Sequence, residues 1–370
     1  MKNIMKITLA LLTSVSLVTS ATAGELTVTG TAKATYNMLS GGTLSASTGQ
    51  AKALGITNEI DFGANGELDN GMTWKYQVQF DPGATTNNGG VDDTRLELSS
   101  ASYGTVGFYV GEGGLDVDNG GSQSVYGRPT DIGLSSGITD GPGIDGFNNV
   151  QFHTPAGLLP FDVVIKAAHA PNNQTALASG NAKGAAIGDG LVRFVGKSTS
   201  QFQIKGSPVD GINLGADYYQ RHDQGNVVET VVQKNEAGSV FATYTMGAAS
   251  FGLSRTMVAP LILGTSATAS AISNTGTSEG NTSSARLYTN TKGSVAYNVN
   301  DNLSISYEQE KSNREVIAQT DENDIKAQAV QAAYTMGGMT LSLSVGSTDN
   351  VGYTKDNDVN QTLFAMSMAF

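Results

Sequence analysis

The chain has 370 residues, of which 46 are glycine and 8 are proline, so it is neither collagen-like nor a proline-rich linker. Charged residues make up 15% and hydrophobic residues 39%, a balance too apolar for a disordered protein. The net charge of −12 argues against a basic nucleic-acid-binding protein, and the absence of cysteine excludes disulfides, thiol nucleophiles and cysteine metal sites.

The first 23 residues have the features of an export signal. Lys2 and Lys6 precede an apolar run over residues 7–18, and Ala21-Thr22-Ala23 matches the small-x-small pattern that signal peptidase cleaves. The run is too short to span a bilayer as a helix, which needs about 20 apolar residues. We therefore expect residues 1–23 to be removed and residues 24–370 to form the mature protein.

The mature chain begins with strict alternation. Every second residue from Leu26 to Tyr36 is apolar or small, and the opposite positions carry threonines and Lys33. This period of two predicts a strand with one apolar and one polar face. A second such strand ends at the tight turn Asp69-Asn70-Gly71, because asparagine and glycine tolerate positive φ.

The same alternation continues to the last residue and predicts sixteen strands. They cover residues 26–36, 56–68, 73–80, 94–99, 105–111, 148–154, 161–168, 191–207, 212–221, 237–246, 251–256, 285–298, 303–311, 325–336, 339–348 and 359–370. Their connections alternate between short and long. Residues 24–370 are thus predicted to form an all-β transmembrane antiparallel barrel with short periplasmic turns and long extracellular loops. No later segment is apolar enough for a membrane-spanning helix, and strands are the other structure that can cross.

The distribution of charge favours the same fold. In seven of the predicted strands the apolar positions carry no charge, whereas the opposite positions carry many: Lys33, Glu59, Asp61, Glu67, Lys75, Asp81, Arg95, Glu97, Asp162, Lys166, Asp217, Arg221, Glu308 and Glu310. Arg255 and Lys326 share the parity of apolar neighbours and would have to lie at the barrel rim. Tyr244, Tyr297 and Tyr334 precede short turns, at the depth expected for an interfacial aromatic girdle.

Three segments resemble the general porins of Gram-negative bacteria, a family of sixteen-stranded trimeric channels. The last strand alternates apolar residues and ends at Phe370, Gly66–Trp74 is similar to the first short turn of these porins, and Tyr103–Phe108 is similar to the strand before their constriction loop. The resemblance implies a homotrimer in the outer membrane, in contact with lipid and lipopolysaccharide. It also implies that the barrel assembly machinery recognises Phe370. The sequence departs from the enterobacterial members in the third loop, which lacks their Pro-Glu-Phe-Gly-Gly run. Separately, the sequence contains no HExxH motif and no GxSxG elbow between a strand and a helix, so we do not expect an enzyme.

The longest connection, residues 112–147, corresponds to the family's constriction loop, which folds into the lumen. Its acidic residues are Glu112, Asp116, Asp118, Asp131, Asp140 and Asp145, against Arg128 alone. We expect them to face a basic wall formed by Lys33, Lys75 and Arg95. A barrel of sixteen strands leaves an aqueous lumen, so we expect a water-filled channel for the passive diffusion of small hydrophilic solutes. The acidic excess of the loop predicts that this channel moderately prefers cations. The other interpretation is that these charges only solvate the wall and the loop.

Other chemistry finds little support in the sequence. The GxGxxG match at residues 141–146 lies in a long loop rather than between a strand and a helix. The segment beginning at Asp116 starts like a calcium loop, but Gly127 stands where the bidentate glutamate should be. No cofactor is therefore expected, with a loosely bound calcium ion left open. His153 and His169 fit rim or lumen positions better than catalysis. The alternatives are a substrate-specific outer-membrane channel and a secreted or surface β-sandwich adhesin.

Overall fold

The computed structural model describes residues 25–42, 52–80, 91–134, 136–171, 198–222, 231–263, 270–272, 285–316 and 323–370. The expected export signal and Asp81 lie outside these residues. Among them, no helix is long and apolar enough to cross a membrane.

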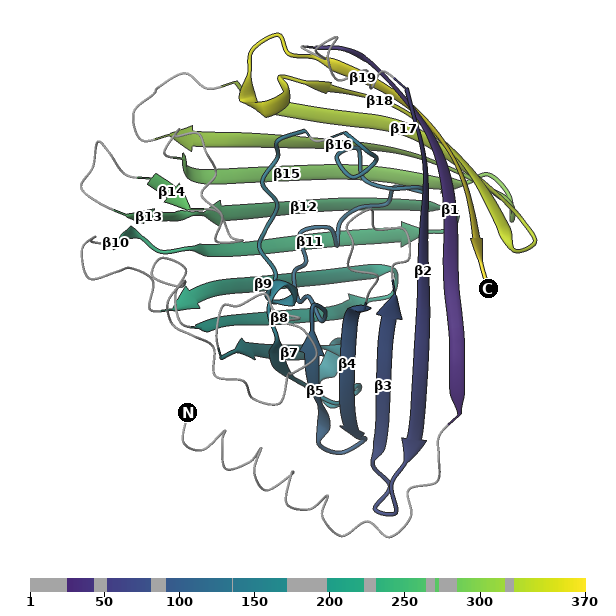
Figure 1. Cartoon of the computed structure of the whole chain (residues 1–370), viewed down its shortest axis with the longest axis vertical. Helices are drawn as coiled ribbons and strands as arrows, with labels where there is room; N and C mark the ends of the chain where they lie inside the picture. Colours follow the sequence, from purple (N-terminus) through teal and green to yellow (C-terminus); the bar gives the residue numbers. More distant parts are fainter. Residues whose placement is uncertain are drawn as a thin grey trace.

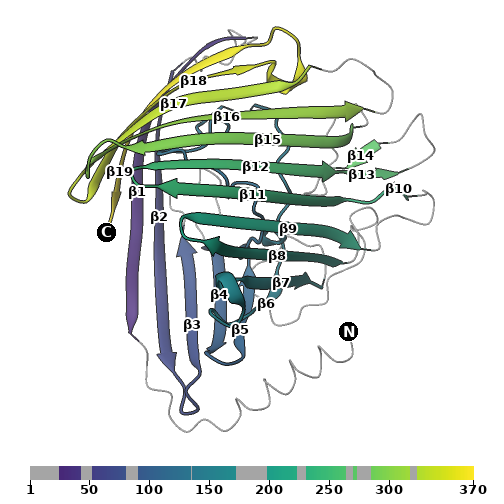
Figure 2. The ribbon, with the colours of Figure 1, turned by 180° about the vertical axis from the view of Figure 1, so that it is seen from behind.

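Sixteen antiparallel strands form a closed barrel (Figures 1 and 2). The strands are β1 (Leu26–Gly41), β2 (Lys52–Glu67), β3 (Thr73–Phe80), β4 (Val91–Ser100), β5 (Gly104–Val110), β6 (Asn149–His153), β7 (Val164–Ala170), β8 (Ser198–Val209), β9 (Ile212–His222), β11 (Glu236–Met246), β12 (Ala249–Ala259), β15 (Ala285–Asn298), β16 (Leu303–Val316), β17 (Ile325–Met336), β18 (Met339–Asp349) and β19 (Val359–Ala369). The predicted fold class is confirmed, and the closed sheet excludes the β-sandwich alternative.

The first and last strands close the barrel. β1 pairs with β19 from Thr31 opposite Ala369 to Gly41 opposite Val359, as the alternation predicted. Beyond the strand, Gly30 and Phe370 exchange backbone hydrogen bonds of 2.9 and 3.0 Å. A closed sheet pairs both edges of every barrel strand, which is what a β structure in lipid requires.

Short turns gather at one end of the barrel (Figure 1). The short turns are residues 68–72, 101–103, 154–163, 210–211, 247–248, 299–302 and 337–338. In the first of them the Met72 N–H donates to Asn70 Oδ1 at 3.1 Å, and Gly71 has a φ of +77°. The predicted turn is therefore present: Gly71 supplies the positive φ, whereas Asn70 has no positive φ and contributes its side-chain oxygen.

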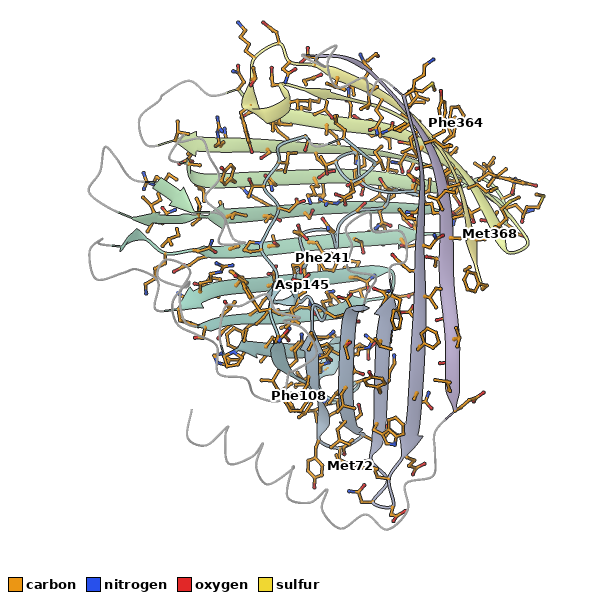
Figure 3. The ribbon with its side chains drawn as sticks, in the orientation of Figure 1. Met72, Phe108, Asp145, Phe241, Phe364 and Met368 are labelled. Carbon is orange, nitrogen blue, oxygen red and sulfur yellow. The ribbon has the colours of Figure 1, made fainter. Side chains whose placement is uncertain are left out.

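The two faces of the wall differ as the alternation predicted. Large apolar side chains such as Leu253 and Phe364 are exposed on the outer face, and Figure 3 shows Phe364 and Met368 pointing away from the barrel. Polar side chains of the opposite parity, such as Thr256 and Gln361, are buried on the inner face. Tyr244, Tyr297 and Tyr334 are exposed on the outer face just before short turns. The barrel is therefore apolar outside and polar inside.

Arg255 does not lie at the rim, so that expectation was wrong. It occupies the middle of β12, on the outer face between Leu253 and Met257, and is paired with Val240 and Thr291. Its long side chain can move its charge away from the apolar neighbours, which makes the position tolerable. Lys326 is the second residue of β17, at the end remote from the short turns, and matches the expectation.

The seventh strand begins later than predicted. Pro160–Asp162 form a 3-10 turn in which Phe161 and Asp162 have φ values of 62° and 51°, and β7 starts only at Val164. Positive φ values are incompatible with the extended backbone of a strand, so the sheet cannot include Phe161 and Asp162. Asp162, predicted on the inner parity, consequently belongs to a turn.

A second, three-stranded sheet lies within connections that were predicted as loops. It consists of β10 (Val231–Gln233), β13 (Leu261–Leu263) and β14 (Ser270–Ile272), outside the barrel order. Leu261 and Ile262 are fully buried. Strands this short have too few residues to show a period of two, so alternation could not reveal them.

Candidate functional site

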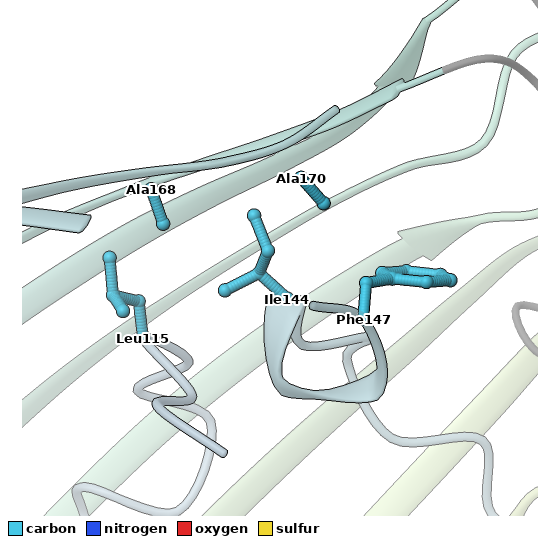
Figure 4. Close-up of a cluster of buried hydrophobic side chains, with 5 residues drawn as sticks. All are labelled: Leu115, Ile144, Phe147, Ala168 and Ala170. Carbon is cyan, nitrogen blue, oxygen red and sulfur yellow. The ribbon is translucent and has the colours of Figure 1, made fainter. Parts of the chain in front are cut away.

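Residues 111–148, which connect β5 to β6, run across the inside of the barrel and are called the inner loop here (Figure 1). Its two ends are fixed on the wall of β7 to β9. The Gln203 side chain donates to the Leu115 carbonyl at 2.6 Å, and the Ile144 N–H donates to Gln201 Oε1 at 2.8 Å. Leu115, Ile144 and Phe147 also bury their side chains against Ala168 and Ala170 of β7 (Figure 4). Small alanines on the inner face of β7 leave the room that these side chains fill.

The middle of the inner loop is fixed on β15 to β19. The Gln123 N–H donates to Ser294 Oγ at 2.9 Å and the Val125 N–H to Ser306 Oγ at 3.0 Å. The Ser124 hydroxyl donates to Glu308 Oε2 at 2.8 Å. Further along, Ile132 packs on Leu363 and Ala365 of β19. The loop therefore covers the late half of the wall and provides hydrogen-bond partners for Ser294, Ser306 and Glu308 Oε2.

Two buried bases, Lys292 of the wall and Arg128 of the loop, form ion pairs with acidic residues where the loop meets the wall. Lys292 of β15 has its ammonium 3.4 Å from Asp140, 3.6 Å from Glu310 and 3.9 Å from Asp118. Arg128 forms ion pairs with Asp131 at 2.7 Å, with Asp140 at 3.2 Å and with Glu310 at 3.4 Å. Asp140 and Glu310 thus each contact both bases.

Burial and these bases shift the pKa values of the carboxyl groups in the loop. Burial alone would raise the pKa of Asp140, but the attraction of Lys292 and Arg128 outweighs it and lowers that pKa. Burial raises the pKa of Asp118 to about 6, against the attraction of Lys292. Burial also raises the pKa of Asp116, and repulsion from Asp145 adds to it. Asp118 should therefore change charge in the mildly acidic range.

The inner face of the early strands remains uncovered. Thr31, Lys33, Glu59 and Lys75 are exposed there, whereas inner-face residues of β8 to β18 such as Gln201, Lys292 and Glu308 are buried. The open part of the lumen therefore lies between the inner loop and the wall of β1 to β3.

The three bases predicted for that wall have different surroundings. Arg95 forms an ion pair with Glu112 of the inner loop at 3.0 Å and also donates to Gln77. Burial raises the pKa of Glu112, although Arg95 opposes the effect. The Lys33 ammonium lies 5.6 Å above the ring of Tyr126 in the inner loop. Lys75 of β3 is paired in register with Asn65 and Glu97.

The predicted acids are likewise divided. Glu112 faces the basic wall, whereas Asp118, Asp131 and Asp140 point to Arg128 or Lys292 on the other side of the loop. Asp116 and Asp145 lie near each other, and Figure 3 shows Asp145 over the interior of the barrel. The loop acids therefore form three groups rather than one row.

Solved structures with the same architecture are bacterial porins. An anion-selective porin from Comamonas acidovorans has a TM-score of 0.63 at 10% sequence identity, covering 94% of this chain and 100% of that chain. OmpF of Salmonella typhi in complex with daunomycin has 0.62 at 12%, covering 94% and 98%, and a mutant of the Rh. blastica porin has 0.55 at 15%, covering 94% and 100%. The chain has the porin fold. No family model matches the sequence, and neither does any curated protein.

The segment of this porin barrel that began like a calcium loop directs its oxygens at a lysine. Lys292 donates to Asn119 Oδ1 at 2.8 Å and lies 3.9 Å from Asp118. Across the described ranges, no three His, Asp or Glu side chains are arranged to hold a metal ion. The ammonium group occupies the position that a cation would need to reach both oxygens.

The histidines of the porin wall have neutral partners. His153 ends β6 and contacts Gln151 Oε1 at 2.8 Å, and His169 and His222 each contact Ser200 Oγ at 3.1 Å. The GxGxxG match includes a 3-10 turn at Ile144–Gly146 within the inner loop. These surroundings are those of structural residues.

Sequence reasoning missed Lys292, the base that holds most of the late wall together. It also missed the amides Gln201, Gln203 and Gln331, which bind the backbone of the inner loop. A signal was present, because Lys292 alternates with Asn290 and Ser294 against the outward Val295 and Tyr297. Parity placed these residues inside the porin barrel, but it could not show that the loop covers them.

Proposed function

We propose that the protein is an outer-membrane porin of a Gram-negative bacterium, through which small hydrophilic solutes and ions diffuse passively. The observation that carries this proposal is the uncovered polar face of β1 to β3 opposite the inner loop. Barrels of sixteen strands enclose an aqueous lumen, and a loop inside narrows it without filling it. Residues 1–23 would be the export signal that brings the chain to the periplasm.

The inner loop serves as the constriction. Lys33, Lys75 and Arg95 on one side and Glu112 on the other create a transverse field across the passage. Such a field orients dipolar solutes and disfavours apolar ones, which would have to displace ordered water. Behind the loop, the acids Asp118, Asp131, Asp140, Glu308 and Glu310 outnumber the two bases Arg128 and Lys292. This excess supports a moderate preference for cations.

The proposal includes a homotrimer, insertion by the barrel assembly machinery through the strand ending at Phe370, and contact with lipopolysaccharide. The aromatic and aliphatic outer face supports membrane insertion: Phe152, Phe202, Leu214 and Phe251 are all exposed there. The protein should require detergent for extraction and should migrate anomalously in an unheated denaturing gel. Release of the protein by osmotic shock alone would contradict membrane insertion.

Solute flux tests the channel function directly. Purified protein in liposomes should admit a series of neutral sugars at rates that fall steeply with molecular size. A substrate-specific channel would instead select one solute chemistry over others of equal size. Liposomes that remain impermeable to the smallest sugar, with heat-modifiable protein present in them, would refute the proposal.

A further inference from the structure

The last long connection, residues 350–358 between β18 and β19, contacts the inner loop through its backbone. The Gly352 N–H donates to the Ser136 carbonyl at 2.9 Å. At the next residue, Gly137 has a φ of +83°, and a Cβ there would lie 2.9 Å from Gly352 Cα. The two segments are thus as close as glycines allow, and a side chain at Gly137 would force them apart.

Residues 350–358 hold their own shape. The Val351 N–H donates to the Asn357 carbonyl at 2.9 Å, and the Asn350 N–H donates to Asp358 Oδ1 at 3.0 Å. Asn350, Tyr353 and Asp356 have φ values of 54°, 60° and 60°, which non-glycine residues seldom adopt. Conformations of this kind persist only where the surroundings enforce them, and they concentrate at functional positions.

Tyr353 anchors this segment in the wall. Its side chain is 7% exposed, its ring lies 4.4 Å from the Arg314 guanidinium carbon, and its hydroxyl is 2.7 Å from Ser312 Oγ. Ser312 donates to Asn290 Oδ1 at 2.6 Å, and the Asn290 amide donates to the Thr139 carbonyl at 2.7 Å. The hydrogen-bond chain from Tyr353 therefore returns to the inner loop three residues beyond Ser136.

We propose that residues 350–358 are a clasp that holds the return limb of the inner loop, residues 136–140, against β15 and β16 and keeps the passage open. The clasp contacts the limb directly through Gly352. It is also linked to the limb indirectly, because Tyr353 hydrogen-bonds to Ser312 of the wall, and Ser312 is connected through Asn290 to Thr139. Asp140, at the end of the limb, is charged and paired with Lys292 and Arg128. A limb released from the clasp keeps the ion pairs of Asp140 and the hydrogen bond from Asn290 to Thr139, but it loses its contact with Gly352 and its link to Tyr353. A transmembrane voltage acting on its charge can then move it into the passage more easily.

This inference rests on the proposed channel function, and single-channel recording separates the two. Gly137→Ala introduces both an unfavourable φ and the contact with Gly352. Gly337→Ala is the matched control, because Gly337 has a φ of +61° in the turn between β17 and β18, with no atom within 4 Å of the added Cβ. Tyr353→Phe removes only the hydroxyl, so it tests the clasp even if Gly137→Ala fails to fold.

We expect Gly137→Ala and Tyr353→Phe to close about fivefold more often at a given voltage, the effect of losing about one hydrogen bond. Gly337→Ala should close as the wild type does. Closing rates of Tyr353→Phe equal to those of the wild type, in protein whose heat shift on a gel is normal, would overturn the clasp. A wild type that conducts no ions would refute the channel itself.

Discussion

Lys292 is buried among carboxylates, so removing its charge should loosen the inner loop. In Lys292→Met the ammonium near Asp118, Asp140 and Glu310 is lost, and the buried carboxylates of Asp118 and Glu310 lose this partner, while Arg128 still pairs with Glu310. Removing one partner of a buried ion pair costs about 3–5 kcal/mol. We expect noisier single-channel currents and faster proteolysis of the loop. Lys75→Met, at an exposed position, is the control and should leave the rate of proteolysis unchanged.

Asp118 should make the properties of the channel depend on pH. Its pKa is raised to about 6, so the carboxyl binds a proton more strongly in the folded loop than in an unfolded chain. The contribution of Asp118 to the stability of the folded loop is therefore fully present below the ordinary carboxyl pKa of about 3.9 and is lost as the pH rises through about 6. The same proton removes a negative charge behind the passage.

Cation preference should accordingly fall between pH 7 and pH 5. In Asp118→Asn this part of the pH dependence should disappear, because the side chain carries no charge at either pH. Reversal potentials measured at a series of pH values provide the comparison. A wild type and an Asp118→Asn variant with identical pH profiles would contradict the assignment.

The inner loop as an element is expected to limit conductance. Residues 115–140 cover the wall of β8 to β19, and their removal should leave a barrel of the same strands with a wider passage. Single-channel conductance should rise severalfold, and larger sugars should enter liposomes. A deletion that leaves conductance unchanged in correctly folded barrels would show that the loop does not narrow the pathway.

The closing strand should control assembly. Phe370 lies on the outer face, hydrogen-bonds through its backbone to Gly30, and covers that glycine with its ring. Deleting Phe370 removes the last closing contact and the residue that the assembly machinery is expected to recognise. The yield of folded, heat-modifiable protein in the outer membrane should fall. Deleting Gly157, in an exposed turn, serves as the control for a one-residue loss.

Alternation predicted the strands because every barrel residue faces one of two very different environments. Leu253 and Ser254 show the rule, one exposed outside and the other buried inside. The path of the inner loop follows no such period. Gln361 binds the Ile132 carbonyl and Gln331 binds Gly127, contacts between residues far apart in the chain that depend on the curvature of the closed sheet. The sequence therefore predicted the barrel and the pairing of Glu112 with the basic wall through Arg95, but not the pairing of Asp118 and Asp140 with Lys292.

The preference of the channel for cations or anions depends on the charges of the whole molecule. The passage is lined by charges of both signs: Lys33, Lys75 and Arg95 share the wall of β1 to β4 with Glu59 and Asp61, and Arg95 pairs with Glu112. This lining alone therefore gives little selectivity. Where the inner loop meets the late strands, acidic residues outnumber the bases Arg128 and Lys292. Their negative potential extends into the nearby passage and should raise the cation concentration there. We therefore expect moderate cation preference at low salt.

Reversal potentials in a KCl gradient across a planar bilayer measure this preference. It should weaken as salt rises, because the Debye length shrinks from about 10 Å at 0.1 M to about 3 Å at 1 M. Glu308→Gln removes one charge from the excess and should lower the preference. Glu67→Gln, near the first short turn and far from the loop, should change it little. Anion preference at low salt in the presence of a chelator would show instead that the basic wall dominates the field.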